Sequence, residues 1–104
     1  MIAAAPPPPP ARIQVVAREF SFVLSRQSIR AGRAIVELRN AGEDAHDLRM
    51  RRIGGSHVYA WPVTQAGGVV DETVSLAPGR YVLYCSLANH RALGMSAVLL
   101  VRKR

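Results

Sequence analysis

Short stretches in which apolar and polar residues alternate restrict the fold of this chain more than any other feature of its sequence. In residues 46–51, His46, Leu48 and Met50 alternate with charged residues. Successive side chains of a β-strand point to opposite faces, so this pattern predicts a strand with one buried face and places His46 on the apolar side. Five more stretches are predicted as strands from alternation or from their β-branched and aromatic residues: 12–24, 34–39, 69–76, 80–85 and 96–101.

Turn signals separate these stretches, and no segment has the 3.6-residue period of an amphipathic helix. Ala31-Gly32 and Ala77-Pro78-Gly79-Arg80 are typical of tight turns. We therefore predict an all-β protein, an antiparallel Greek-key β-sandwich of seven to eight strands. Residues 53–68 hold two Gly-Gly pairs and a Trp-Pro pair, and we interpret them as a loop. We expect Trp61 to pack either in the core or within this loop. His57, a conceivable extra metal ligand, is interpreted as an exposed or capping residue.

The first eleven residues differ in composition from the rest of the chain. Pro6–Pro10 are five consecutive prolines, which lack amide donors and favour a polyproline II spacer about 15 Å long. We divide the chain into a Pro-rich disordered spacer at residues 1–11 and one domain at residues 12–104. The spacer lacks a basic n-region and an apolar h-region, so we do not expect an intact signal peptide. It would suit a tether to a membrane or to a larger chain upstream.

The chain is strongly basic. It has 14 Lys and Arg against 7 Asp and Glu, which gives a net charge of +7. Such a charge favours acidic protein surfaces, anionic lipids or nucleic acid, although a basic surface without a dedicated partner stays an alternative. The chain has one Trp, three Tyr and two Phe, and no basic run is interleaved with stacking rings, so we expect no nucleic-acid partner. No run approaches the ~18 apolar residues of a membrane span.

The stretch from Cys85 to Met95 concentrates soft and borderline metal ligands. The single cysteine, Cys85, is followed after five residues by His90 and after five more by Met95. Thiolate, imidazole and thioether groups, together with one more imidazole, suit a copper ion that cycles between Cu(I) and Cu(II). His46, on the apolar side of its predicted strand, is available as that second imidazole.

Two motifs occur in a fixed order, Asn-x-Gly-x-x-x-His-Asp and then Cys-x4-His-x4-Met before a final apolar strand. Their residues are Asn40, Gly42, His46, Asp47, Cys85, His90 and Met95. With these motifs the chain, from about Arg12 onward, resembles the cupredoxins, small type 1 (blue) copper proteins of the plastocyanin and azurin kind. Many relatives have Pro-Gly before the second histidine, where this chain has Ala88-Asn89.

The resemblance implies one copper ion per chain. The implied ligands are His46, Cys85, His90 and Met95. Two neutral imidazoles and the thiolate would lie in a rough trigonal plane, and the Met95 thioether would be a weak axial ligand that tunes the reduction potential. The resemblance also implies that the backbone N–H of Asp47 or of a neighbour donates to the Cys85 sulfur. Asp47 would tie the two ligand-bearing segments together through Ser86.

These features predict a protein that carries single electrons and is not an enzyme. The alternative is a copper-handling protein that delivers or buffers copper for an extracytoplasmic oxidase. Methionine is a poor zinc ligand, a dinuclear copper site would need a second cysteine, and a cysteine protease would leave Met95 unexplained. A multicopper oxidase or nitrite reductase is disfavoured because the neighbours of Cys85, Tyr84 and Ser86, are not histidines. An interaction module without metal is disfavoured because all four ligands are present.

The resemblance further implies an extracytoplasmic (periplasmic or cell-surface) monomer. In cupredoxins the histidine of the Cys-His-Met loop presents a ring edge inside an apolar surface patch. Here that edge would belong to His90, and the patch would be formed by Ala88, Ala92, Leu93 and Gly94. Because the chain is basic, we expect a redox partner with an acidic docking surface.

Overall fold

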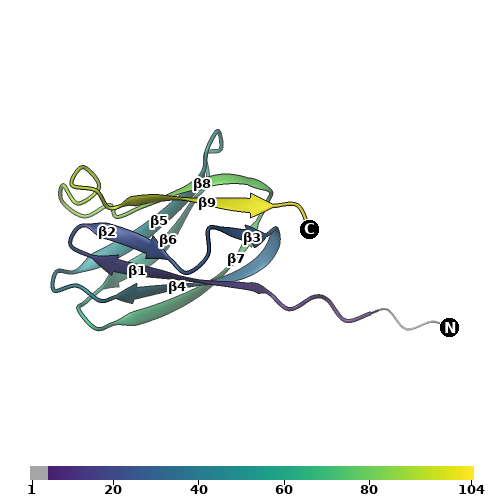
Figure 1. The fold of residues 1–104 in the computed structure, drawn as a ribbon, viewed down its shortest axis with the longest axis horizontal. Coiled ribbons are helices and arrows are strands. Elements are labelled where there is room, and N and C mark those ends of the chain that lie inside the picture. The colour runs from purple at the N-terminus through teal and green to yellow at the C-terminus, as the bar shows by residue number, and fades with distance from the viewer. Residues whose placement is uncertain (1–4) are drawn as a thin grey trace.

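The computed structural model describes residues 5–104, which form a sandwich of two β-sheets without helices (Figure 1). The strands in this range are β1 (Ala11–Arg18), β2 (Ser21–Leu24), β3 (Ser28–Arg30), β4 (Gly32–Asn40), β5 (His46–Arg52), β6 (Val58–Thr64), β7 (Val69–Leu76), β8 (Gly79–Tyr84) and β9 (Ser96–Arg102). Nothing in the described range is a helix long and apolar enough to cross a bilayer.

One sheet has four strands in the order β2-β1-β4-β7, and the other has five in the order β3-β9-β8-β5-β6. The predicted all-β sandwich is confirmed. Two details differ: residues 5–104 form nine strands rather than seven to eight, and both sheets are mixed rather than wholly antiparallel. The parallel neighbours are β1 with β4 and β3 with β9.

The additional strands were not predicted because the sequence pattern does not mark their boundaries. Residues 12–24, predicted as one strand, reverse direction after Arg18 and form β1 and β2, which pair as an antiparallel hairpin. Strand β3 has only three residues, too few for an alternation pattern to be recognised.

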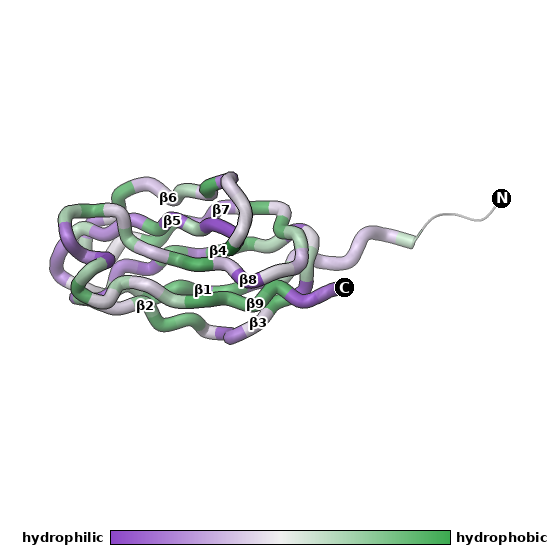
Figure 2. The backbone as a smooth tube through the Cα atoms, turned by 90° about the horizontal axis from the view of Figure 1, so that it is seen from above, coloured by the Kyte–Doolittle hydropathy of each residue, from purple (hydrophilic) through white to green (hydrophobic). Residues whose placement is uncertain are grey.

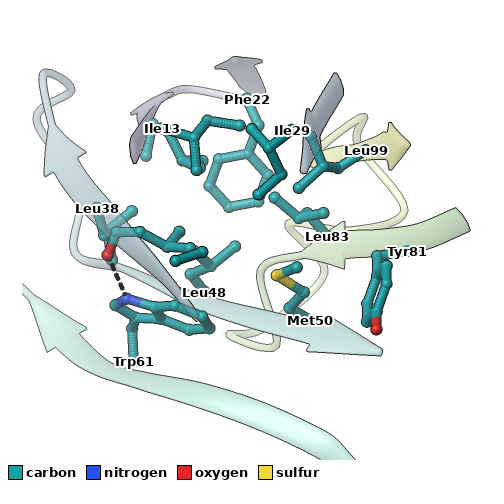
Figure 3. Close-up of a cluster of buried hydrophobic side chains, with 14 of the residues drawn as sticks. Ile13, Phe22, Ile29, Leu38, Leu48, Met50, Trp61, Tyr81, Leu83 and Leu99 are labelled. Carbon is teal, nitrogen blue, oxygen red and sulfur yellow. Dashed lines mark hydrogen bonds between the residues drawn. The ribbon is translucent and has the colours of Figure 1, made fainter. Parts of the chain in front are cut away.

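The interpretation of residues 53–68 as a loop was wrong, because they contain β6. Pro62 is compatible with this strand because β6 lies at the edge of its sheet and its pairing with β5 is irregular between His46 and Leu48. Proline cannot donate to a sheet ladder and is tolerated at edges and bulges. Trp61 packs in the core as predicted: it is 2% exposed, and its Nε1 donates to the Val36 carbonyl of the opposite sheet at 3.0 Å (Figure 3).

Alternate residues of the strands fill the space between the sheets, as Figure 3 shows for part of the core. The residues that follow β9 are hydrophilic (Figure 2). The loop between β8 and β9 lies at the end of the sandwich opposite to residues 5–10 and to the C-terminus (Figure 1). This loop is the segment that carries the predicted ligands Cys85, His90 and Met95.

The predicted N-terminal spacer is only partly described. Residues 5–10 form no strand, and β1 begins at Ala11, which the sequence assigned to the spacer. Residues 1–4 of the predicted spacer lie outside the described residues.

We expect Trp61→Phe to lower the free energy of unfolding by about 1–3 kcal/mol, because the buried Val36 carbonyl loses its donor. Urea denaturation measures this loss. Val63→Ala, at a 52% exposed position of the same strand, is the control and should change stability by less than about 0.5 kcal/mol. If both variants lost the same free energy of unfolding, the hydrogen bond of Trp61 to the opposite sheet would not contribute to stability.

Candidate metal centre

His46 begins β5 and is completely buried. Its Nδ1 has no hydrogen-bond partner, whereas its Nε2 lies 3.4 Å from Glu19 Oε2. A buried polar atom without a partner is unusual in folded proteins and calls for an explanation. The predicted placement of His46 on the inward side of its strand is confirmed.

Cys85 directly follows β8, is completely buried and is a free thiol. Burial raises the pKa of this thiol, and hydrogen bonds from the backbone N–H groups of Asp47 and Leu87 oppose that rise. The influence of the Asp47 backbone N–H on the sulfur agrees with the prediction, and that of the Leu87 N–H was not predicted.

The loop from Cys85 to Met95 is closed by its own backbone. Met95 N–H donates to the His90 carbonyl at 3.1 Å, and Cys85 N–H donates to the Met95 carbonyl at 3.3 Å. A further bond joins His90 N–H to the Leu87 carbonyl at 3.0 Å. These bonds bring Cys85, His90 and Met95 together at one end of the sandwich.

His46, Cys85 and His90 converge. One potential ligand atom from each lies within 4.8 Å of those of the other two. His90 Nδ1 is 3.6 Å from Cys85 Sγ, and the two imidazole centroids are 5.1 Å apart. Met95 is fully buried at the end of the same loop, and its role as axial ligand stays a prediction. His57 is exposed and packs edge-on against Tyr59, at a centroid distance of 4.4 Å, outside this cluster.

Asp47 joins the two ligand-bearing segments, as the sequence predicted. Its Oδ1 accepts the Ser86 backbone N–H at 2.7 Å, and its Oδ2 accepts the Ser86 hydroxyl. Asp47 is 2% exposed, and its carboxylate oxygens are satisfied by these donors, with Arg49 Nε 3.5 Å from Oδ2. Because Asp47 follows His46 and Ser86 follows Cys85, this contact fixes the two candidate ligands relative to one another.

Glu19 is part of the site and was missed by the sequence analysis. Its carboxylate accepts the backbone N–H groups of Glu43 and Asp44, the latter at 2.6 Å, and it contacts His46. These interactions, led by the bond from Asp44, hold the pKa of Glu19 below its ordinary value. Gly42 permits the approach, because a Cβ there would collide with the carboxylate. Glu19 lies 27 residues before His46, and no local sequence signal connects the two.

Two more residues of the site have no local signature. Phe20 lies beside His90, with ring centroids 4.9 Å apart. Asn40, quoted above only as part of a motif, is buried and donates from Nδ2 to the carbonyls of Asp44 and Thr64. It thereby holds the loop before His46 against the end of β6.

The rim of the cluster is exposed and partly apolar. His90 is half-buried, and the four residues predicted to form a patch around it are exposed: Ala88, Ala92, Leu93 and Gly94. Leu93 is 51% exposed. The imidazole of His90 is therefore the candidate ligand nearest to solvent.

The donors present fit copper. Two imidazoles and one thiol with soft or borderline character have potential ligand atoms within 4.8 Å of one another, and the Nδ1 of His46, which has no hydrogen-bond partner, is free to bind a metal. This cluster could hold one copper ion.

No family model matches the sequence, and a search of curated proteins finds no similar sequence. Solved structures are similar in fold. Auracyanin from the photosynthetic bacterium Roseiflexus castenholzii superimposes with a TM-score of 0.71 at 18% identity, over 88% of this chain and 96% of its own. Auracyanin A, a "blue" copper protein from Chloroflexus aurantiacus, gives a TM-score of 0.73 at 17% identity, over 90% of this chain and 100% of its own.

One of the similar structures is an enzyme, and this chain matches only part of it. The copper-containing nitrite reductase from Thermus scotoductus has a TM-score of 0.60 and 22% identity, and the match spans 98% of this chain but 24% of the enzyme. The smaller proteins in this comparison, the auracyanins among them, are cupredoxins. The chain therefore has the cupredoxin fold.

Ala88 is the only non-glycine residue with a positive φ among residues 5–104, with φ of 45°. This left-handed conformation costs an alanine about 1–2 kcal/mol. We expect Ala88→Gly to raise the free energy of unfolding by about 0.5–1 kcal/mol, since glycine removes the strain but loses some chain entropy. Ala92→Gly, in the same loop, lacks the strain and should destabilise the protein by about 0.4–1 kcal/mol. Denaturant melts of both variants measure this difference. A lower free energy of unfolding in both variants would contradict the strain at Ala88.

Proposed function

We propose that this chain is a copper-binding electron-transfer protein with one mononuclear type 1 site. The observation that carries the proposal is the convergence of His46, Cys85 and His90 at one end of a cupredoxin fold, with a buried Nδ1 that has no other partner. Bound copper would supply a one-electron Cu(I)/Cu(II) couple.

The roles of the ligands follow from their chemistry. The Cys85 thiolate and the neutral rings of His46 and His90 would form the strong ligand set, and Met95 the weak axial one. Burial of Met95 and the backbone bonds that join it to Cys85 and His90 support this assignment. Metal binding would also offset the raised pKa of the Cys85 thiol, because a bound cation favours the thiolate.

The surroundings favour electron transfer, since they restrict movement of the ligands. Asp47 holds the Cys85 segment to β5, and Glu19 holds the loop before His46 while contacting the ring itself. Groups of this kind orient metal ligands and tune the metal. A site that moves little between two oxidation states exchanges electrons with a small structural barrier.

We propose that the chain itself is not an enzyme. Tyr84 and Ser86 flank Cys85, so this segment offers no histidine that could connect the site to a second copper centre. The alternative, copper delivery to or buffering for an extracytoplasmic oxidase, uses the same ligands. Reversible voltammetry and a fast self-exchange rate would favour the electron carrier, whereas facile transfer of Cu(I) to a chelating acceptor would favour copper handling.

The remaining assignments belong to the same proposal. Residues 12–104, together with Ala11 at the start of β1, would form the copper-binding domain, and the Pro-rich residues before Ala11 would form a spacer. We also propose an extracytoplasmic location and a monomeric state. The electron would pass to or from a redox partner protein near the solvent-facing edge of His90, where small apolar residues permit close approach.

We expect addition of Cu(II) to give an intense blue absorption from thiolate-to-copper charge transfer and a small hyperfine splitting in the EPR spectrum. Cys85→Ser should abolish both. Copper bound only by the folded state should also stabilise it, by about 4 kcal/mol at a thousandfold excess over Kd. A colourless complex with ordinary tetragonal spectra would exclude a type 1 site, and thermal melts with and without copper measure the stabilisation.

Met95→Leu should retain copper and raise the reduction potential, because a donor that favours Cu(II) is lost. Met50→Leu is the matched control, since Met50 is equally buried but lies within β5, outside the loop from Cys85 to Met95. Voltammetry and absorption spectra of both variants identify the axial ligand. A shift in the Met50 variant alone would mean that Met95 is not that ligand.

A further inference from the structure

The outward face of the five-stranded sheet carries a concentration of positive charge. Alternation along the strands places Arg49 and Arg51 of β5, Arg80 of β8 and Arg102 of β9 on this face. Arg30 of β3 is paired with Arg102 and also points outward. We call this surface the arginine face. It comprises Arg30, Arg49, Arg51, Arg80, Arg102 and Arg91, whose guanidinium lies 4.1 Å from the centre of the Tyr84 ring.

No acidic side chain of residues 5–104 is exposed on the arginine face. Asp47 points to this side of β5 but is buried against Ser86. The other acidic residues lie on the four-stranded sheet or on segments at the candidate metal centre: Glu37, Asp71 and Glu72, and Glu19, Glu43 and Asp44. The outward face of the four-stranded sheet is mixed, because Glu37 and Asp71 are register partners there among arginines.

An apolar strip lies between these arginines. Val98 and Leu100 of β9 are 47% and 42% exposed, and Val82 of β8 is paired with Val98. Arg51 lies beside Val82, and Arg80 beside Leu100. Apolar side chains at the centre and charged ones around them are the usual arrangement of a protein–protein interface, in which arginine is enriched.

The arginine face is continuous with the candidate metal centre. Tyr84 lies on this face and directly precedes Cys85, and Arg91, which covers the Tyr84 ring, directly follows His90. A protein bound here would therefore lie against the segment that carries two of the proposed ligands.

We propose that the arginine face is the docking surface for an acidic redox protein. This inference rests on the proposed electron-transfer function. Guanidinium groups pair with carboxylates in a bidentate manner, which gives orientation as well as attraction. An anionic membrane is less suited to this surface, because the apolar strip consists of Val82, Val98 and Leu100 and lacks the Trp and Phe that usually anchor proteins at lipid interfaces. Copper held by His46, Cys85 and His90 would supply one electron, and a one-electron acceptor in the partner, such as the ferric haem of the cytochrome used below, would take it up.

The test compares two double charge reversals that change the net charge equally. Arg80→Glu with Arg102→Glu alters the arginine face, and Arg33→Glu with Arg39→Glu alters exposed positions on the outward side of the other sheet. A strongly acidic c-type cytochrome is the probe, and stopped-flow mixing with the copper-loaded protein gives the second-order rate constant. At low ionic strength we expect the first pair to lower the rate at least tenfold and the second less than threefold, with both copper spectra unchanged.

A second measurement does not depend on copper. Backbone amide resonances of the isotopically labelled protein, with or without the metal, should shift on β8 and β9 when the acidic cytochrome is added, and the shifts should vanish at high salt. Equal rate losses in the two double variants, or shifts confined to residues 88–94, would overturn the proposal. A third result would also overturn the proposal: the protein binds vesicles with 30% phosphatidylserine, the Arg80/Arg102 variant loses this binding, and the cytochrome causes no resonance shifts. Failure of copper binding would instead contradict the proposed function and leave the resonance measurement valid.

Discussion

The carboxylate of Asp47 is the contact on which the candidate metal centre depends. It bonds Ser86 through both oxygens across a separation of 39 residues. Without it, the segment after Cys85 would lose both of its bonds to the Asp47 side chain, and the nearest ladder pair between β5 and β8 is Arg49 with Tyr84. A buried carboxylate is costly unless its hydrogen bonds are satisfied, so the same interaction that places the ligands also accounts for a buried charge beside them. The contacts of the sandwich itself therefore fix the positions of His46 and Cys85 relative to one another.

Charge is distributed unevenly over this basic domain. Carboxylates occur near the site and on the four-stranded sheet, whereas the five-stranded sheet presents arginines around an apolar strip. Glu19 contributes locally by restraining His46, while the arginines act over longer distances on whatever approaches. If the arginines bind a partner as proposed, the environment of the site and the recognition of that partner can vary independently.

The sequence predicted those parts of the structure that depend on local pattern. Alternation at residues 46–51 placed His46 inward, and the spacing of Cys85, His90 and Met95 identified the loop that closes over the site. What it did not predict depends on contacts between distant segments. Glu19 reaches His46 only because β1 turns back toward β2 at that point, and β6 forms around Trp61-Pro62 because an edge position and an irregular pairing tolerate proline. The parallel partners of β1 and β3 likewise have no signature in their own residues.

Strand β9 has a consequence for how the protein matures in the cell. It is hydrogen-bonded on both sides, to β3 near residue 29 and to β8, and the loop that ends at Met95 leads directly into it. A chain emerging from the ribosome with its N-terminus first cannot complete the five-stranded sheet until residues 96–102 have appeared. Until then Cys85 lacks the backbone bond from its own N–H to Met95 and has no enclosed position. Under the proposed function, the nascent chain would carry an accessible thiol, and a metal could be enclosed at this site only after residues 96–102 had been synthesised.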